Sequence, residues 1–189
     1  RRVQVLSVLG LGWATGRVVH MHYQPADSSE VHETDLHPYF IEPSAIGYAT
    51  YVIGYARHAK DLRTFKVERI LSAELTAESF VVPEDFDGPT LLQPAWGVMY
   101  GGKTQEVALR FVPGATRRVQ ESHWHPSQRL EACDDGGCIL RLTISHPEEM
   151  RYWIRGWGPQ VEVLAPGWLR QEMAREAREM ARVYGEGQE

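Results

Sequence analysis

Alternation of apolar and polar residues is the clearest pattern in the first part of the chain. In residues 17–23, Met21 and Tyr23 alternate with His20 and His22. Because successive side chains of a strand point to opposite faces, this period of two predicts a half-buried β-strand. Similar patterns predict four more short strands, at residues 36–41, 48–55, 62–66 and 67–75. Turn-forming residues separate the strands, among them those at 25–29 and 43–47.

Five short strands joined by tight turns favour a small closed barrel over a sandwich. We therefore predict an Sm/SH3-like five-stranded β-barrel over residues 17–83. Apolar residues at helical spacing predict a connecting helix over residues 1–16, and we expect a further segment upstream because the chain begins without Met. The proline-rich residues 84–95 predict a linker.

The apolar pattern changes after this linker. A strand is predicted at 105–112, followed by a helix, a hairpin around Asp-Asp-Gly-Gly, a second helix and a fourth strand. This β-α-β-β-α-β order is typical of the ferredoxin-like fold, so we predict such a domain over residues 96–185 and an α+β protein as a whole. A last amphipathic helix follows Pro166, and its apolar stripe consists of Leu169, Met173, Met180 and Tyr184.

The composition narrows the possible partners. The chain carries 20 basic and 25 acidic residues, for a net charge of −5, and neither half has the basic excess of a module that coats duplex DNA. No apolar run is long enough to cross a membrane, so we expect a cytoplasmic protein. The two cysteines, Cys133 and Cys138, flank the predicted hairpin, and in that compartment we expect free thiols.

Common catalytic and cofactor motifs are missing from the sequence. There is no glycine-rich phosphate loop, nucleophile elbow or Cys-x-x-Cys pair, so we expect neither an enzyme nor a cofactor. His20/His22 and His123/His125 each form a His-x-His pair, which on a strand points to one face. A metal site would need a third ligand, and no carboxylate or cysteine stands close by in sequence. We therefore expect no metal, with a metal-dependent enzyme as the alternative.

A cluster of cationic and aromatic residues in the predicted barrel is more informative. Arg63, Phe65 and Arg69 share parity on a run of extended chain, so two guanidiniums could frame one ring. Neighbouring strands add Tyr23, Tyr39 and Tyr51. Guanidiniums bind phosphate and aromatic rings stack on bases, which favours a nucleotide or a short single strand. The alternative is that the rings fill the core and the arginines form surface ion pairs. A second group of residues could form another basic patch, and the alternative is a solvated helix face. The group consists of Arg117, Arg118, Arg129 and Trp124.

Three segments resemble the WYL family in their order and spacing. They are His37-Pro-Tyr39-Phe-Ile, Gly47-Tyr-Ala-Thr-Tyr51-Val-Ile-Gly-Tyr55 and Leu62-Arg63-Thr-Phe65-Lys-Val-Glu-Arg69-Ile70. The tripeptide that names the family is Thr50-Tyr51-Val52 here, so only its Tyr is kept. The resemblance covers about residues 17–83, and its Arg-x-Phe…Arg-Ile part is the most specific.

Downstream segments resemble the C-terminal extension of such proteins, called WCX. They are Trp96-Gly97, the strand at 107–111, residues 119–128 and residues 160–166. This resemblance implies the sensing region of a bacterial transcription regulator, in which an upstream winged helix-turn-helix binds promoter DNA. It also implies that the barrel senses a nucleotide or nucleic-acid fragment, and that the second domain dimerises or transmits the signal.

Carried over by position, the resemblance implies a set of ligand contacts in the barrel. The set consists of Tyr51, Arg63, Phe65 and Arg69, with Tyr23 and Tyr39 as further candidates and His20 and His22 as donors at the rim. We therefore expect a homodimeric regulator whose barrel binds a phosphate-bearing ligand. The alternative function is a non-switching module that holds single-stranded nucleic acid for a nuclease or helicase.

Overall fold

The chain divides into two compact units. The computed structural model describes residues 1–44 and 49–185, and the units comprise residues 1–91 and 92–189. The boundary falls inside the segment expected to be a linker. The turn predicted at residues 43–47 extends into positions outside the described residues.

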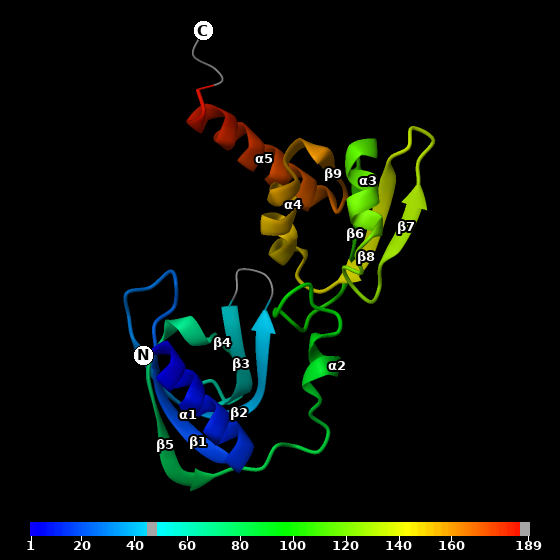
Figure 1. Cartoon of the computed structure of the whole chain (residues 1–189). Coiled ribbons are helices and arrows are strands. Elements are labelled where there is room, and N and C mark those ends of the chain that lie inside the picture. Colours follow the sequence, from blue (N-terminus) through cyan, green and yellow to red (C-terminus); the bar gives the residue numbers. More distant parts are fainter. Residues whose placement is uncertain (45–48, 186–189) are drawn as a thin grey trace. The chain divides into compact units, whose positions relative to one another are not determined.

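The first unit contains a five-stranded antiparallel sheet in the order β4-β3-β2-β1-β5 (Figure 1). Its strands are β1 (Arg17–Tyr23), β2 (His32–Ser44), β3 (Ala49–Ala56), β4 (Asp61–Lys66) and β5 (Ile70–Ser79). All five predicted strands are therefore present, and β2 is longer than its apolar pattern indicated.

The expected closed barrel is not confirmed. Among the described residues, β4 pairs only with β3 and β5 only with β1, so the sheet is open at both strands. The predicted strand at 67–75 was wrong at its start, because a 3-10 turn, η2 (Val67–Arg69), separates β4 from β5. The Glu68 carboxylate holds this turn by accepting a hydrogen bond from the Thr50 N–H at 3.2 Å and pairing with Arg2.

Helix α1 (Arg2–Thr15) covers one face of this sheet (Figure 1). Its Leu9 is fully buried against the alternate residues of β1 that the sequence pattern assigned to the core, Val19 and Met21. Burial of a leucine side chain contributes about 1.5–3 kcal/mol. The helix therefore belongs to the core of the first unit, although the sequence led us to expect a connecting segment.

Gly54 on β3 lies where the backbone of β2 comes unusually close. The register of the β2–β3 pair shifts between Pro38 and Phe40, and a Cβ atom at Gly54 would lie 2.1 Å from the carbonyl oxygen of His37. No side chain fits at that distance, so the close approach of the two strands requires glycine here.

The segment that follows β5 packs on aromatic residues of β2. Phe80 stacks on His37 with ring centroids 5.0 Å apart, and Phe86 meets Tyr39 edge to face at 5.1 Å. A short helix, α2 (Gly88–Leu92), lies in the stretch expected to be a linker. Much of that stretch therefore contributes to the fold of the first unit.

The second unit contains a four-stranded antiparallel sheet in the order β7-β8-β6-β9. Its strands are β6 (Gln105–Phe111), β7 (Arg129–Ala132), β8 (Cys138–Ile144) and β9 (Val161–Ala165), and its helices are α3 (Pro113–Gln120), α4 (Arg151–Trp157) and α5 (Gly167–Val183). Short 3-10 turns, η3 (Pro147–Met150) and η4 (Gly158–Gln160), flank α4. The predicted ferredoxin-like order of elements is confirmed.

An aromatic cluster fills the core of the second unit. Trp153 meets Trp124 at 4.9 Å and Trp96 at 5.1 Å, and Trp157 packs on Phe111 at 5.1 Å, with all these rings edge to face. Edge-to-face pairs of this kind add about 0.5–1.5 kcal/mol each beyond their burial. The cysteines at the β7–β8 hairpin are free thiols, as expected.

Two glycine substitutions in the first unit should have opposite effects. Gly54→Ala should lower the free energy of unfolding by about 1–3 kcal/mol, because the added methyl group must displace β2. Gly10→Ala should raise it by about 1 kcal/mol, because nothing lies within 4 Å of the new Cβ inside α1. Urea unfolding followed by circular dichroism measures both values, and equal effects would contradict the described packing.

Acid should destabilise the second unit through His125. Burial lowers the pKa of His125 below its ordinary value of 6.5, so the unfolded chain binds this proton more tightly than the folded one. Stability from the neutral ring is present above pH 6.5 and is lost as the pH falls below it. Between a pH well above 6.5 and one well below it, the free energy of unfolding in urea should therefore fall less for His125→Gln than for the wild type. An identical pH dependence of the two proteins would refute the assignment.

Candidate functional site

A row of cationic side chains follows the edge strand β4. Lys60, Arg63, Lys66 and Arg69 occur at every third position, and only Asp61 and Glu68 are acidic in this stretch. We call these four residues the β4 strip. Arg63 and Arg69 are exposed and Lys66 is half-buried. The strip thus places local positive charge on an edge of a chain whose net charge is −5.

Arg63 is held by its immediate neighbours. Its guanidinium pairs with Asp61 at 2.7 Å and donates to the carbonyl of Leu62 at 3.0 Å. This hydrogen bond lowers the pKa of Asp61 below its ordinary value. Both side chains are about half exposed or more, so the pair is screened by water and costs little to open for another anion.

Arg69 ends the η2 turn, and its guanidinium makes no hydrogen bond or ion pair within the described part of the chain. Its backbone is fixed because its carbonyl accepts a hydrogen bond from the Gln24 N–H at 3.1 Å. An exposed guanidinium on a fixed backbone is a good donor to phosphate or carboxylate oxygens.

The predicted pair of guanidiniums around one ring does not form as expected. Phe65 is only 7% exposed and belongs to the core, where it meets Tyr23 edge to face at 5.1 Å. Arg63 and Arg69 were expected on one face because they share parity along an extended strand. The η2 turn interrupts that strand. Three residues of strand, about 10 Å, separate Arg63 from the end of β4. The two arginines therefore lie at different points along the strip.

Tyr51 is the aromatic residue nearest the strip in register. It lies directly opposite Lys66 in the β3–β4 pair and is half-buried. Phe65, by contrast, lies opposite the buried Val52. Of the aromatic candidates, Tyr51 is thus the one that the fold places beside a cation of the strip.

Tyr39 lines a cavity beside the start of β4. The cavity has a volume of about 480 Å³, and its lining includes Lys60 of the β4 strip and three aspartates, Asp61, Asp85 and Asp87. Burial raises the pKa of the Tyr39 hydroxyl above the ordinary value. The three aspartates outnumber Lys60 and disfavour phosphate here, so we do not assign Tyr39 to the nucleic-acid site, although the cavity adjoins the Lys60 end of the strip.

His20 and His22 lie together on β1, away from β4. Both Nε2 atoms approach the Glu33 carboxylate on β2, at 3.2 Å for His20 and 3.9 Å for His22. Asp35, hydrogen-bonded to His20, raises the pKa of that histidine above its ordinary value. Sequence reasoning missed Glu33, because only the β1–β2 register places it opposite His22.

The second group of arginines is already engaged. Arg118 lies over the ring of Trp157 at 4.5 Å, and Arg117 pairs with Glu121 at 2.8 Å. Trp124 is part of the aromatic cluster rather than a free stacking surface. These contacts support the solvated helix face over a second basic patch.

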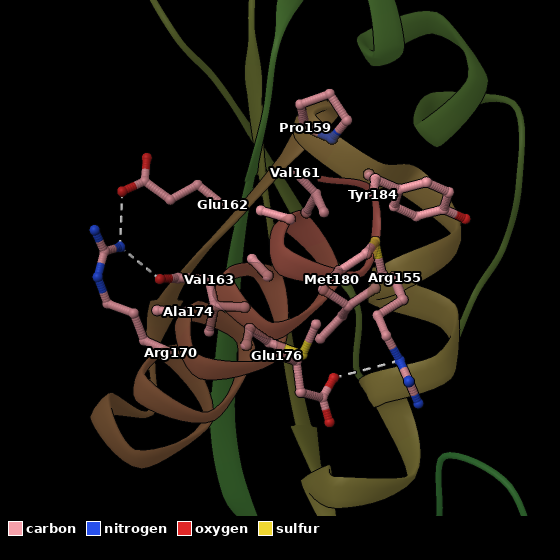
Figure 2. A pocket seen from close by; sticks show the side chains of 15 residues that line it. Arg155, Pro159, Val161, Glu162, Val163, Arg170, Ala174, Glu176, Met180 and Tyr184 are labelled. Carbon is pink, nitrogen blue, oxygen red and sulfur yellow. Dashed lines mark hydrogen bonds and ion pairs between the residues drawn. The ribbon is translucent and has the colours of Figure 1, made fainter. Parts of the chain in front are cut away.

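A groove of about 760 Å³ lies between α4, β9 and α5 in the second unit (Figure 2). Met173, Ala177 and Met180 line it from α5. The charged residues at its rim form ion pairs. Arg155 pairs with Glu176 at 3.4 Å, and Arg170 pairs with Glu162 at 2.7 Å. The groove is therefore an apolar surface with fixed charges at its margin.

Comparison with protein families identifies both units. The WYL domain family matches residues 4–75 and the WCX domain family matches residues 103–181. The WYL match begins inside α1, in agreement with the packing of that helix in the core of the first unit. None of the described helices is long and apolar enough to span a membrane.

The following curated relatives and solved structures match this chain at sequence identities of 28% or less. Protein PafC from two strains of Mycobacterium tuberculosis is 28% identical over 138 residues, which is 68% of this chain. The chain spans 39% of the length of these relatives. The crystal structure of a CRISPR Cas-related protein shares the fold, with a TM-score of 0.59 at 14% identity over 99% of this chain and 52% of that one. Proteasome accessory factor B/C of Arthrobacter aurescens aligns over 95% of this chain and 27% of its own, with a TM-score of 0.44 and 17% identity.

The family matches confirm the resemblance that the sequence motifs indicated. The chain is a WYL-domain protein, with a WYL domain in its first unit and a WCX domain in its second.

Proposed function

We propose that this chain is the sensing region of a transcription regulator, and that its β4 strip binds a short single-stranded nucleic acid. The observation that carries the proposal is the set of cations along an edge strand and the turn that follows it. Within the described residues the Arg69 guanidinium is unengaged, and Arg63 is held only by the exposed Asp61 carboxylate and the Leu62 carbonyl. The WYL and WCX domains support a regulatory role.

The spacing of the strip favours an extended ligand over a single phosphate. Arg63 and Lys66 are three strand residues apart, about 10 Å, and Arg69 lies beyond the turn that follows. Because side chains alternate along a strand, Arg63 and Lys66 point to opposite faces of this edge. One phosphate group cannot reach both, whereas in the proposed complex a strand with several phosphates follows the edge and meets cations on either side of it. Tyr51, opposite Lys66, offers a ring for one base.

In this proposal the ligand controls a DNA-binding domain that lies elsewhere in the protein. A ligand can shift a conformational equilibrium only as far as it binds one state more tightly than the other. We therefore propose that the protein is a homodimer and that nucleic acid on the strip favours one dimer geometry over another. The role proposed for the strip is binding, and no catalytic step is needed.

The apolar C-terminal end of α5, which borders the groove of the second unit, supports self-association. The C-terminal end of α5 extends beyond its sheet (Figure 1). Met180 (47%), Val183 (81%) and Tyr184 (82%), which directly follows the helix, are exposed there. In a two-fold dimer the same surface of each copy meets its counterpart, so the apolar end of one helix can pack on that of its partner.

Loss of the two arginines should weaken nucleic-acid binding. We expect Arg63→Ala combined with Arg69→Ala to raise the Kd for a fluorescently labelled single-stranded oligonucleotide roughly tenfold or more, because each guanidinium loses a charge-assisted contact. Fluorescence anisotropy measures the Kd. The control is Arg117→Ala with Arg129→Ala, which removes the same charge from exposed positions of the second unit. Equal binding by wild type and the Arg63/Arg69 variant, or equal losses in both double variants, would refute the site.

The salt dependence of binding should change in the same variant. Each phosphate neutralised on a single strand contributes about 0.7 to the slope of log K against log salt concentration. Removal of two phosphate contacts should therefore reduce the slope by about 1.4, while the control pair should leave it unchanged. An unaltered slope would show that the two arginines do not contact phosphate.

A charge placed in the apolar end of α5 should disrupt the dimer. We expect Met180→Glu to shift the protein towards monomer in size-exclusion chromatography with light scattering, because the carboxylate would be desolvated in the interface. Leu130→Glu, at an exposed position of β7 in the same unit, is the control. A monomeric wild type, or a Met180→Glu variant that stays dimeric, would exclude this interface.

A further inference from the structure

Three potential metal ligands converge on one face of the β1–β2 pair. One ring nitrogen of His20, one of His22 and a carboxylate oxygen of Glu33 lie within 4.8 Å of one another. We propose that these three residues form a binding site for a divalent transition-metal ion, Zn²⁺ in the first instance. The proposal is independent of the nucleic-acid site, because β1 and β2 carry it and β4 does not.

The distances are close to those that a zinc ion imposes. Zinc bonds to nitrogen and oxygen of about 2.0–2.2 Å place tetrahedral ligand atoms roughly 3.3 Å apart. The His20 Nε2 atom lies 3.2 Å from one Glu33 oxygen, and the His22 Nε2 atom lies 3.9 Å from the other. The two histidine nitrogens lie within 4.8 Å of each other, so binding of one ion requires rotation of the imidazole rings as well as of the exposed Glu33 side chain.

Both histidines are oriented through their second ring nitrogen. His20 Nδ1 is hydrogen-bonded to the Asp35 carboxylate at 2.8 Å, and His22 Nδ1 to the Ser72 hydroxyl at 3.0 Å. Metal-binding histidines commonly have such a partner, which fixes the tautomer and makes the other nitrogen a better ligand. With Nδ1 occupied, the Nε2 atoms are the ones that face Glu33.

The local charge also favours a cation. Glu33, Asp35 and Glu74 surround the histidines, and Glu74 lies opposite His20 in the β1–β5 pair. Arg57 offsets part of this charge, because it pairs with Asp35 at 2.9 Å and with Glu78 at 2.6 Å. Two imidazoles and one carboxylate form a ligand set that zinc uses at sites where water completes the coordination.

The strand register brings residues of three strands to one site. His20 and His22 share a face of β1, Glu33 lies opposite His22 on β2, and Ser72 lies opposite His22 on β5. A bound ion would thus link β1 to β2, and through the hydrogen bond of His22 to β5. Such a link should stabilise the first unit when metal is present.

The direct test is isothermal titration of untagged, metal-free protein with zinc chloride. We expect one equivalent of zinc to bind, and His22→Ala to weaken that binding at least tenfold. Asp35→Asn should weaken it by about 10–100-fold, as loss of an orienting carboxylate does elsewhere. The control is His32→Ala, an exposed histidine next to Glu33 that lies opposite Tyr23 in register.

Each outcome bears on the proposal. Absence of saturable zinc binding to the wild type would overturn it, as would equal binding by His22→Ala or an equal loss in His32→Ala. Circular dichroism verifies that each variant is folded, and Glu33→Gln replaces His22→Ala if the latter is not. Oligonucleotide binding measured on the same variants keeps the two sites apart, since we expect His22→Ala to bind oligonucleotide as the wild type does.

Discussion

Burial of one sheet face under α1 is the constraint on which the first unit depends. Because side chains alternate along a strand, burial of Val19 and Met21 leaves His20 and His22 on the opposite face. A slip of one residue between β1 and β2 would expose the apolar set and bury the imidazoles. The same packing that stabilises the sheet therefore also brings Glu33 to the histidines.

Local sequence pattern predicted the elements better than it predicted their junctions. Alternation identified all five strands of the first unit, and the hairpin signal with two helical segments identified the ferredoxin-like order. The η2 turn was missed because Val67 and Ile70 are apolar residues that a strand or a turn can bury equally well. What decides between them is the contact of Glu68 with Thr50 and Arg2, and those residues are distant in sequence.

The candidate sites, too, were predicted only in part from the sequence. Arg63, Arg69 and Tyr51 were proposed from motif and spacing, and the fold leaves them on or beside an accessible edge. Phe65 shares the motif but packs in the core, because it lies opposite the buried Val52 of β3 and against the ring of Tyr23. Glu33 could not be assigned without the strand register. Residue type thus indicated the chemistry, and tertiary pairing decided which residues share a site.

Since β4 is an edge strand, its outer backbone N–H and C=O groups have no partner strand among the described residues. Such an edge can template pairing with another chain, and natural proteins commonly guard it with charged side chains. The cations spaced along β4 meet that need: two copies brought edge to edge would set like charges against each other. A surface suited to polyanions therefore also protects the protein from uncontrolled aggregation, and evolutionary loss of its charges would carry a cost in solubility even where ligand binding is dispensable.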